Sequence, residues 1–175
     1  MVGKETSTDP DKRTPRRSTV NYWLLKSEPD VYGLDDLKDE GTDLWDGVRN
    51  YQARNNLQAM KPGDLGLFYH SRTKPPHVAG LCKIVKKAYP DPTAFDPKEK
   101  YYDPKSDPDN PRWFCPDVAY VCHFPEIVSL KEIKEVESLS EMVLVKNSRL
   151  SVQPVTAAEF KKVCKMGGLK KIPKG

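Results

Sequence analysis

The sequence lacks the features of a membrane or secreted protein. No apolar run among its 175 residues approaches the roughly 20 residues that span a bilayer. Residues 1–17 contain no apolar stretch of the kind found in a secretory signal peptide. Hydrophobic residues make up 37% of the chain and charged residues 31%, so we expect a soluble intracellular protein without a membrane partner.

Cysteine and histidine are also scarce. No two cysteines form a C-x-x-C pair, and no histidine lies at a zinc-site spacing from them. The residues concerned are Cys82, Cys115, Cys122, Cys164, His70, His77 and His123. We therefore expect reduced thiols rather than a disulfide framework, no metal and no cofactor.

Charge of neither sign dominates. The formal net charge is +4, a mild bias toward anionic partners. Part of it lies at the two ends, in Lys12–Arg17 and Lys170–Lys174, which are poor in large apolar groups, so we expect both ends to be disordered. The chain thus divides into a disordered basic segment (1–19), one domain (20–167) and a basic C-terminal tail (168–175).

The first half of the domain mixes strand and helix patterns. Aromatic and aliphatic density predicts a strand over 20–26. Apolar spacing predicts a short helix over 34–38 that ends at Gly41, and a second helix over 51–60. Two further strands are expected over 64–71 and 78–89.

The second half begins with an irregular segment. Six of the sixteen prolines lie between residues 89 and 112, which predicts a long loop. One or two strands follow over 113–128, and capping-box patterns at Ser129 and Thr156 predict two more helices, the last one ending at Gly167. Strands and helices without regular alternation predict the α+β class, as a small barrel with peripheral helices.

Polar side chains gather at the ends of the predicted elements. They lie at 26–28, at 45–55 and at 68–71. The middle stretch is rich in amides and guanidiniums, which need hydrogen-bond partners when buried and which can read the edge of a nucleobase. Trp45 would offer a face on which a base stacks. The alternative is a surface helix whose tryptophan fills a gap in the core.

These stretches resemble the EVE domain. The motifs that carry the resemblance are YWLLKSEP at 22–29, WDGVRNYQARN at 45–55, FYHS at 68–71, AGL at 79–81, YPD at 89–91 and RLSVQP at 149–154. The similarity runs from about residue 21 to residue 166. Gly33 departs from the pattern, because we expect a serine cap before the short helix at that position.

The resemblance implies a fold and a function. The implied fold is PUA-like, a small curved β-barrel flanked by helices and related to the YTH domains that read N6-methyladenine. The implied function is that of a non-catalytic reader, which binds a modified base in DNA, of the 5-hydroxymethylcytosine class, in a flipped-base pocket. We expect such a protein to be a monomer in the nucleus, with the cytoplasm as a second compartment.

The resemblance also implies site residues. Those expected to bind the base are Lys26, Ser27, Trp45, Gly47, Val48, Arg49, Asn50, Tyr69, His70 and Ser71. Those expected to bind phosphate are Lys26, Arg49 and Arg54. Within the first set we expect Trp45 and Tyr69 to stack on the base, and Asn50 and Ser27 to meet its edge.

Two other functions stay open. PUA-like and YTH relatives bind RNA, and the charge pattern does not separate RNA from DNA, so a modified RNA base is the first alternative. A nucleic-acid-modifying enzyme is the second and less favoured one. The sequence contains no G-x-S-x-G, P-loop or zinc-deaminase motif, and His70 and Ser71 would point to opposite faces of a strand.

Overall fold

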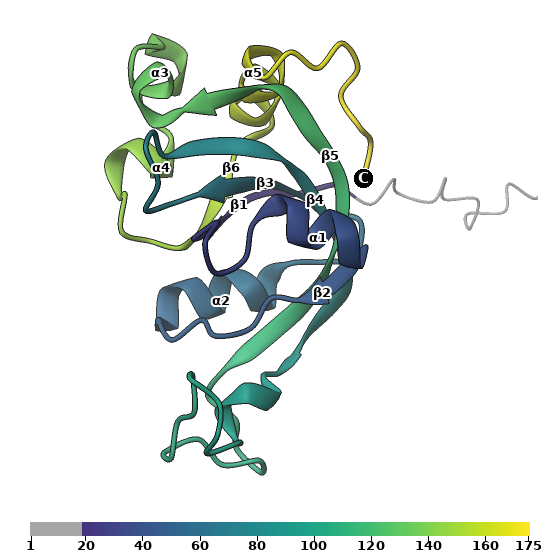
Figure 1. Ribbon diagram of the computed structural model, residues 1–175, viewed down its shortest axis with the longest axis vertical. Helices are drawn as coiled ribbons and strands as arrows, with labels where there is room; N and C mark the ends of the chain where they lie inside the picture. Colours follow the sequence, from purple (N-terminus) through teal and green to yellow (C-terminus); the bar gives the residue numbers. More distant parts are fainter. Residues whose placement is uncertain (1–18) are drawn as a thin grey trace, which may run out of the picture.

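The computed structural model describes residues 19–175, and the prediction for the basic N-terminal segment falls on residues outside this range. Within it lies a mixed sheet with the strand order β2-β5-β4-β3-β1-β6 (Figure 1). The strands are β1 (Tyr22–Ser27), β2 (Thr42–Leu44), β3 (Leu65–His70), β4 (His77–Pro90), β5 (Phe114–Ser129) and β6 (Val152–Val155). The pair β1 and β3 is parallel, whereas the other pairs are antiparallel.

Helices cover both faces of this sheet. They are α1 (Leu34–Glu40), α2 (Tyr51–Ala59), α3 (Leu130–Lys134), α4 (Val143–Lys146) and α5 (Ala157–Met166), with short 3-10 turns at Pro92–Ala94 and Glu137–Leu139. The predicted α+β class is confirmed. The closed barrel is not confirmed, because β2 and β6 are the two ends of the hydrogen-bonded order and are not paired with each other.

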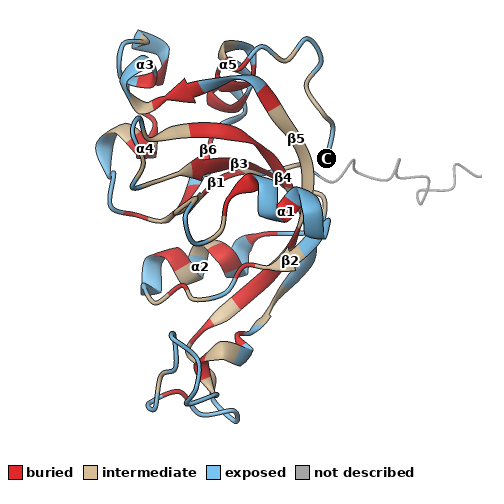
Figure 2. Ribbon diagram, viewed as in Figure 1, coloured by how far each residue is buried: buried red, intermediate tan, exposed pale blue. Residues whose placement is uncertain are grey.

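The central strands are buried on both faces, so their sequences are continuous apolar runs. Side chains alternate across the sheet. Trp23, Leu25 and Phe68 join one core cluster together with residues of α1 and α2. Leu24 and Leu67 join a second cluster with residues of α3, α4 and α5. Figure 2 shows this burial concentrated in the central strands.

Capping groups fix where the helices begin. The Thr156 hydroxyl accepts from the Glu159 amide, and the Glu159 carboxylate accepts from the Thr156 amide, which confirms the capping box of α5. Ser129 supplies one half of such a box to α3. At α1, the Leu34 amide donates to Nε2 of His70 at 3.1 Å. A histidine from β3 therefore satisfies a free amide in the first turn of α1, where the sequence has no serine cap at position 33.

The strands β4 and β5 are long enough to carry the proline-rich segment away from the sheet. Apart from the 3-10 turn, residues 91–113 are irregular, as predicted, and mostly exposed (Figure 2). Figure 1 shows them at the end of β4 and β5 opposite α3 and α5. Residues 114–129 form one strand rather than two.

The C-terminal tail differs from the expectation of disorder. Leu169 and Ile172 are partly buried and pack against the second core cluster. Across residues 19–175, the structure contains no helix with the length and apolarity needed to cross a bilayer.

Candidate functional site

A cavity of about 780 Å³ opens where the parallel strands β1 and β3 end. Such a volume is typical of sites for small organic molecules. Parallel strands present their carboxyl ends at one edge, so the loops that follow them converge there. The lining residues belong to 26–28, 31–32, 43–49, 71–72, 100–101, 148–149 and 151.

The cavity brings together most of the residues expected at the site. Those that line it are Lys26, Ser27, Trp45, Gly47, Val48, Arg49 and Ser71. Three others do not line it, and each has a structural role. Asn50 caps α2, since its Oδ1 accepts from the Ala53 amide at 2.9 Å. The Tyr69 side chain is buried in the second core cluster, and His70 caps α1.

The remaining phosphate candidate, Arg54, lies outside the cavity. Its guanidinium donates to the carbonyl of Arg112 at 3.0 Å and to Oδ1 of Asn55 at 2.9 Å. It also lies over the ring of Tyr51, with 4.8 Å between Cζ and the ring centroid. Arg54 thus links α2 to the end of the proline-rich segment.

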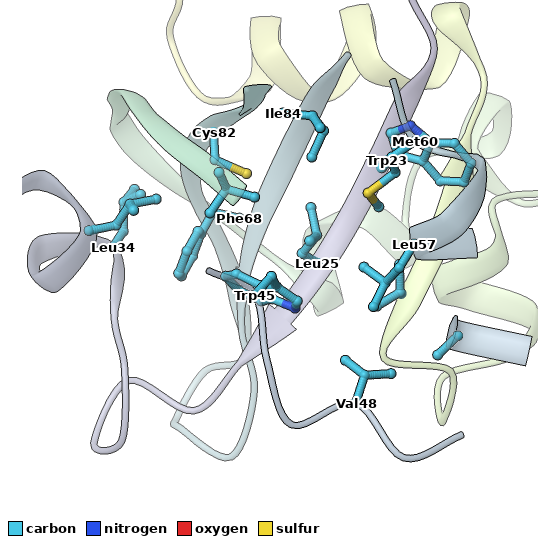
Figure 3. Packing of buried hydrophobic residues seen from close by; sticks show 14 of the residues in the cluster. Trp23, Leu25, Leu34, Trp45, Val48, Leu57, Met60, Phe68, Cys82 and Ile84 are labelled. Atoms are coloured by element: carbon cyan, nitrogen blue, oxygen red, sulfur yellow. The ribbon is translucent and has the colours of Figure 1, made fainter. Parts of the chain in front are cut away.

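Trp45 belongs both to the core and to the cavity wall. It is 7% exposed and meets Phe68 edge to face, with 5.4 Å between ring centroids (Figure 3). Its indole N–H has no partner among residues 19–175. The indole nitrogen of Trp45 is not fully buried, because among residues 19–175 the one fully buried side-chain nitrogen or oxygen without a hydrogen-bond partner is Oε1 of Gln153. Trp45 therefore fills a gap in the core and also lines the cavity, and its stacking on a base stays a prediction.

Arg49 fastens the proline-rich segment to the cavity. Its guanidinium donates to Oδ2 of Asp91 at 2.9 Å, and twice to the carbonyl of Tyr101, at 2.9 and 2.7 Å. The other two donors meet the carbonyl of Val48 and the hydroxyl of Thr93. All five donors are therefore used by the protein, which differs from the phosphate contact expected of Arg49.

The Asp91 carboxylate is fully enclosed and has four partners. Oδ1 accepts from the amide and the hydroxyl of Thr93, and Oδ2 accepts from the Gly47 amide and from Arg49. Burial alone would raise the pKa of Asp91, but the hydrogen bonds from Thr93, Gly47 and Arg49 outweigh it and lower the pKa. Asp91 is thus a charged anchor for two residues that line the cavity, Gly47 and Arg49.

Gly47 is required by the close approach of Tyr101. A Cβ at position 47 would lie 2.7 Å from two carbons of the Tyr101 ring, and the φ of Gly47 is +77°. Both features exclude ordinary side chains. The proline-rich segment therefore seats an aromatic ring on the turn that follows Trp45.

Lys26 and Ser27 form the wall at the end of β1. Nζ of Lys26 donates to the carbonyl of Ser148 and lies 5.5 Å from the centroid of the Tyr69 ring. Partial burial lowers the pKa of Lys26. Ser27 donates its hydroxyl proton to the carbonyl of Tyr32 at 2.5 Å, so its oxygen can still accept from a ligand.

Acidic side chains also line the cavity, although no carboxylate was among the residues expected to bind the base or the phosphate. Glu28, Asp43 and Asp46 line it. Partial desolvation, and then the nearby charge of Asp91, raise the pKa of Asp46. Tyr101 and Arg149 reach the cavity from segments far along the chain. The sequence motifs contain Glu28, Asp46 and Arg149, whereas no motif contains Asp43 or Tyr101.

The described residues offer little for metal chemistry. No group of three or more histidine, cysteine, aspartate or glutamate side chains among residues 19–175 is arranged to hold a metal ion. The four cysteines are unpaired, and all but the half-buried Cys122 are buried. The cavity instead combines an aromatic wall, carboxylates, hydroxyls and cations, a set suited to holding a flat polar ring.

Three comparisons place the chain among known proteins. Thymocyte nuclear protein 1 of Homo sapiens is 41% identical over 182 residues, which cover 91% of this chain and 81% of that protein. The crystal structure of the human THYN1 protein in complex with DNA containing 5-methylcytosine superposes with a TM-score of 0.81 at 43% identity, covering 86% of this chain and 99% of that one. The YTH domain of Zygosaccharomyces rouxii MRB1 shares the fold alone, with a TM-score of 0.51, 15% identity and 91% of each chain covered.

The family itself is shown by the span of the match. The EVE domain family matches residues 21–166, the same range over which the sequence motifs run. That range contains every strand and helix of the described structure and all of the cavity. The chain therefore belongs to the EVE domain family.

Proposed function

We propose that this protein is a non-catalytic reader that holds a modified cytosine, flipped out of DNA, in the cavity that Trp45 lines. The observation that carries the proposal is the cavity itself, in which an aromatic wall is combined with donors, acceptors and a rim of cations. A similar fold has been solved in complex with DNA containing 5-methylcytosine. The relatives are named as nuclear proteins, which supports a nuclear location for this one.

The energetics favour base binding in the pocket together with electrostatic attraction between cationic side chains and the DNA phosphates. Flipping a base out of a duplex costs a few kcal/mol. Stacking on an aromatic side chain returns roughly 1–3 kcal/mol. Lys26, Lys100 and Arg149 at the cavity would add attraction to the phosphates. We expect a modest affinity that falls as salt rises, and a protein that binds as a monomer.

The polar groups suggest how cytosine is distinguished from thymine. Cytosine carries an amino group at the position where thymine has a carbonyl oxygen, and carboxylates accept hydrogen bonds from that amino group. Asp43 and Asp46 supply carboxylates at the cavity. For 5-hydroxymethylcytosine, the finer assignment, Ser27 and Ser71 are the hydroxyls that would meet the added group.

A binding competition tests this proposal. Oligonucleotides that carry one cytosine, 5-methylcytosine or 5-hydroxymethylcytosine in DNA are titrated beside an RNA that carries one N6-methyladenine. We expect the modified DNA to bind best, whereas preference for the RNA would replace the DNA assignment. Mass spectrometry of the oligonucleotides after incubation tests the non-catalytic assignment, because any change of mass would show turnover.

A further inference from the structure

A ladder of stacked cationic and aromatic side chains leads away from the cavity. In spatial order its members are Lys100, Tyr101, Arg49, Trp113, Tyr51 and Arg54. Cζ of Arg49 lies 5.8 Å from the centroid of Tyr101 and 5.6 Å from that of Trp113. Trp113 and Tyr51 stack, with centroids 5.0 Å apart and planes inclined by 25°. The cavity wall is thereby connected to the first turn of α2.

Burial in the core does not account for the two tyrosines of this ladder. Its middle is enclosed, since Trp113 is 6% exposed. Tyr51, in contrast, is 53% exposed and Tyr101 is 37% exposed. Tyr51 also occupies the first position of α2, where it contributes neither a cap nor good helix propensity. The ladder therefore leaves aromatic rings and cations in solvent beside the site.

This combination fits one class of partner. Proteins that bind single-stranded nucleic acid place aromatic side chains where bases stack and cations where the backbone runs. Arg54 and Lys100 are cations that lie directly over exposed tyrosine rings. An apolar partner would desolvate these cations without supplying an anion, whereas a nucleotide supplies both a flat ring and a phosphate.

The ladder is also held in place before any ligand arrives. The hydrogen bonds from Arg49 to Tyr101 fix one end, and the bond from Arg54 to the carbonyl of Arg112 fixes the other. Little ordering is then required on binding, which favours affinity. Tyr101 and Arg49 line the cavity as well, so a strand that leaves the cavity can pass directly onto the ladder.

We propose that this ladder is a second contact for the nucleic-acid strand and holds the nucleotide next to the flipped base through Tyr51 and Arg54. The proposal rests on the proposed function, because it extends the same bound strand. Free nucleoside would occupy the cavity alone, whereas an oligonucleotide would reach both sites. The two contacts can therefore be separated by ligand length.

The experiment compares Tyr51→Ala with wild type, with Tyr51→Phe, and with Gln52→Ala as an exposed control on the same helix turn. The ligands are 5-methyl-2′-deoxycytidine, a single-stranded oligonucleotide with one 5-methylcytosine, and its unmodified counterpart. We expect Tyr51→Ala to weaken both oligonucleotides about tenfold while nucleoside binding stays unchanged. Tyr51→Phe keeps the ring and should bind like wild type, as should Gln52→Ala.

The outcomes separate the two proposals. If Tyr51→Ala binds both oligonucleotides like wild type, the ladder makes no strand contact and the inference is overturned. An equal loss for nucleoside and oligonucleotide in a folded Tyr51→Ala protein would also overturn it, since Tyr51 would then support the cavity. If wild type shows no preference for the modified base but Tyr51→Ala still weakens the unmodified strand, the modified-base function fails and the ladder stands.

Discussion

Arg49 and Asp91 are ion-paired at 2.9 Å, and they join the turn after β2 to the start of the proline-rich segment. The Asp91 side chain is fully buried, and that of Arg49 is 20% exposed. Because every donor of Arg49 already has a protein acceptor, a phosphate could be bound only if one of these bonds broke. In this structure Arg49 holds the segment as a fixed wall of the cavity.

Arg49→Lys should loosen that wall. Lysine keeps the charge but loses the planar fork, so the bonds to Tyr101 and Asp91 cannot all be made. We expect a local loss of about 2 kcal/mol, equivalent to roughly thirtyfold faster hydrogen exchange within residues 92–112. The Asp103 amide, which donates to the carbonyl of Ala94, is a suitable probe.

Arg72→Lys is the matched control. Arg72 pairs with Glu28 at 3.2 Å, but its side chain is 81% exposed, so the same substitution should change stability by less than about 0.5 kcal/mol. Unchanged exchange in Arg49→Lys would show that the segment is held by its own turns instead of by Arg49.

The local parts of the fold were predictable because they depend on neighbouring residues. The apolar runs of β1 and β3, the end of α1 at Gly41 and the cap of α5 at Thr156 all follow from short patterns. Asn50 was predicted to read a base but caps α2. Asparagine is a preferred N-cap residue, so the sequence was compatible with a capping role for Asn50. The neighbouring amides and guanidiniums favoured the base-reading interpretation instead.

The contacts that the sequence could not indicate join residues that are distant along the chain. Arg49 and Asp91 are 42 residues apart, and His70 caps a helix that begins 36 residues earlier. Spacing carries no information about such pairs. The placement of Tyr101 on Gly47 depends likewise on where a long loop returns. The sequence could therefore indicate which stretches carry the site but not which of their side chains turn inward.

Trp45→Phe should separate the two roles of Trp45. Trp45→Ala would remove about 3–5 kcal/mol of core stability, so a loss of binding in that variant would be ambiguous. Phenylalanine keeps a ring against Phe68 but removes the indole N–H that has no partner among the described residues. We expect an affinity for modified DNA about tenfold lower, because the acceptor on the base is left unpaired.

Trp23→Phe provides the comparison for that experiment. Trp23 lies in the same core cluster but does not line the cavity, and its indole N–H donates to Asp64 at 3.0 Å. This variant should lose stability and keep its affinity for DNA. Equal affinities for Trp45→Phe and wild type would assign Trp45 to the core alone.

Stability should depend on the protonation of His70. Nε2 of His70 accepts the Leu34 amide, so the proton lies on Nδ1 and is donated to Nε2 of His77 at 3.1 Å. Burial, and then the neighbouring His77, lower the pKa of His70 from 6.5 to about 4. The unfolded chain thus binds more protons between these values, and stability rises with pH.

The measurable result is a loss of stability as the solution is acidified. The contribution of neutral His70 is complete above pH 6.5 and is lost as the pH falls to about 4. We expect a loss of about 2 kcal/mol, seen as a falling Tm. In His70→Gln an amide oxygen can still accept from Leu34 without titrating, so the decline should be smaller. Identical pH profiles would contradict the assigned cap.

Lys26 should contribute charge rather than base selectivity. Its amino group lies at the cavity, donates to the Ser148 carbonyl and is partly desolvated, and this burial lowers the pKa of Lys26. Lys26→Met keeps the apolar stem near Tyr69 and removes one charge. We expect weaker binding to modified and unmodified DNA alike, with the slope of log K against log salt reduced by about one.

The control is Lys162→Met, at an exposed position on α5. It removes the same charge on the far side of the sheet and should leave that slope unchanged. A loss confined to modified DNA would instead assign Lys26 to the base.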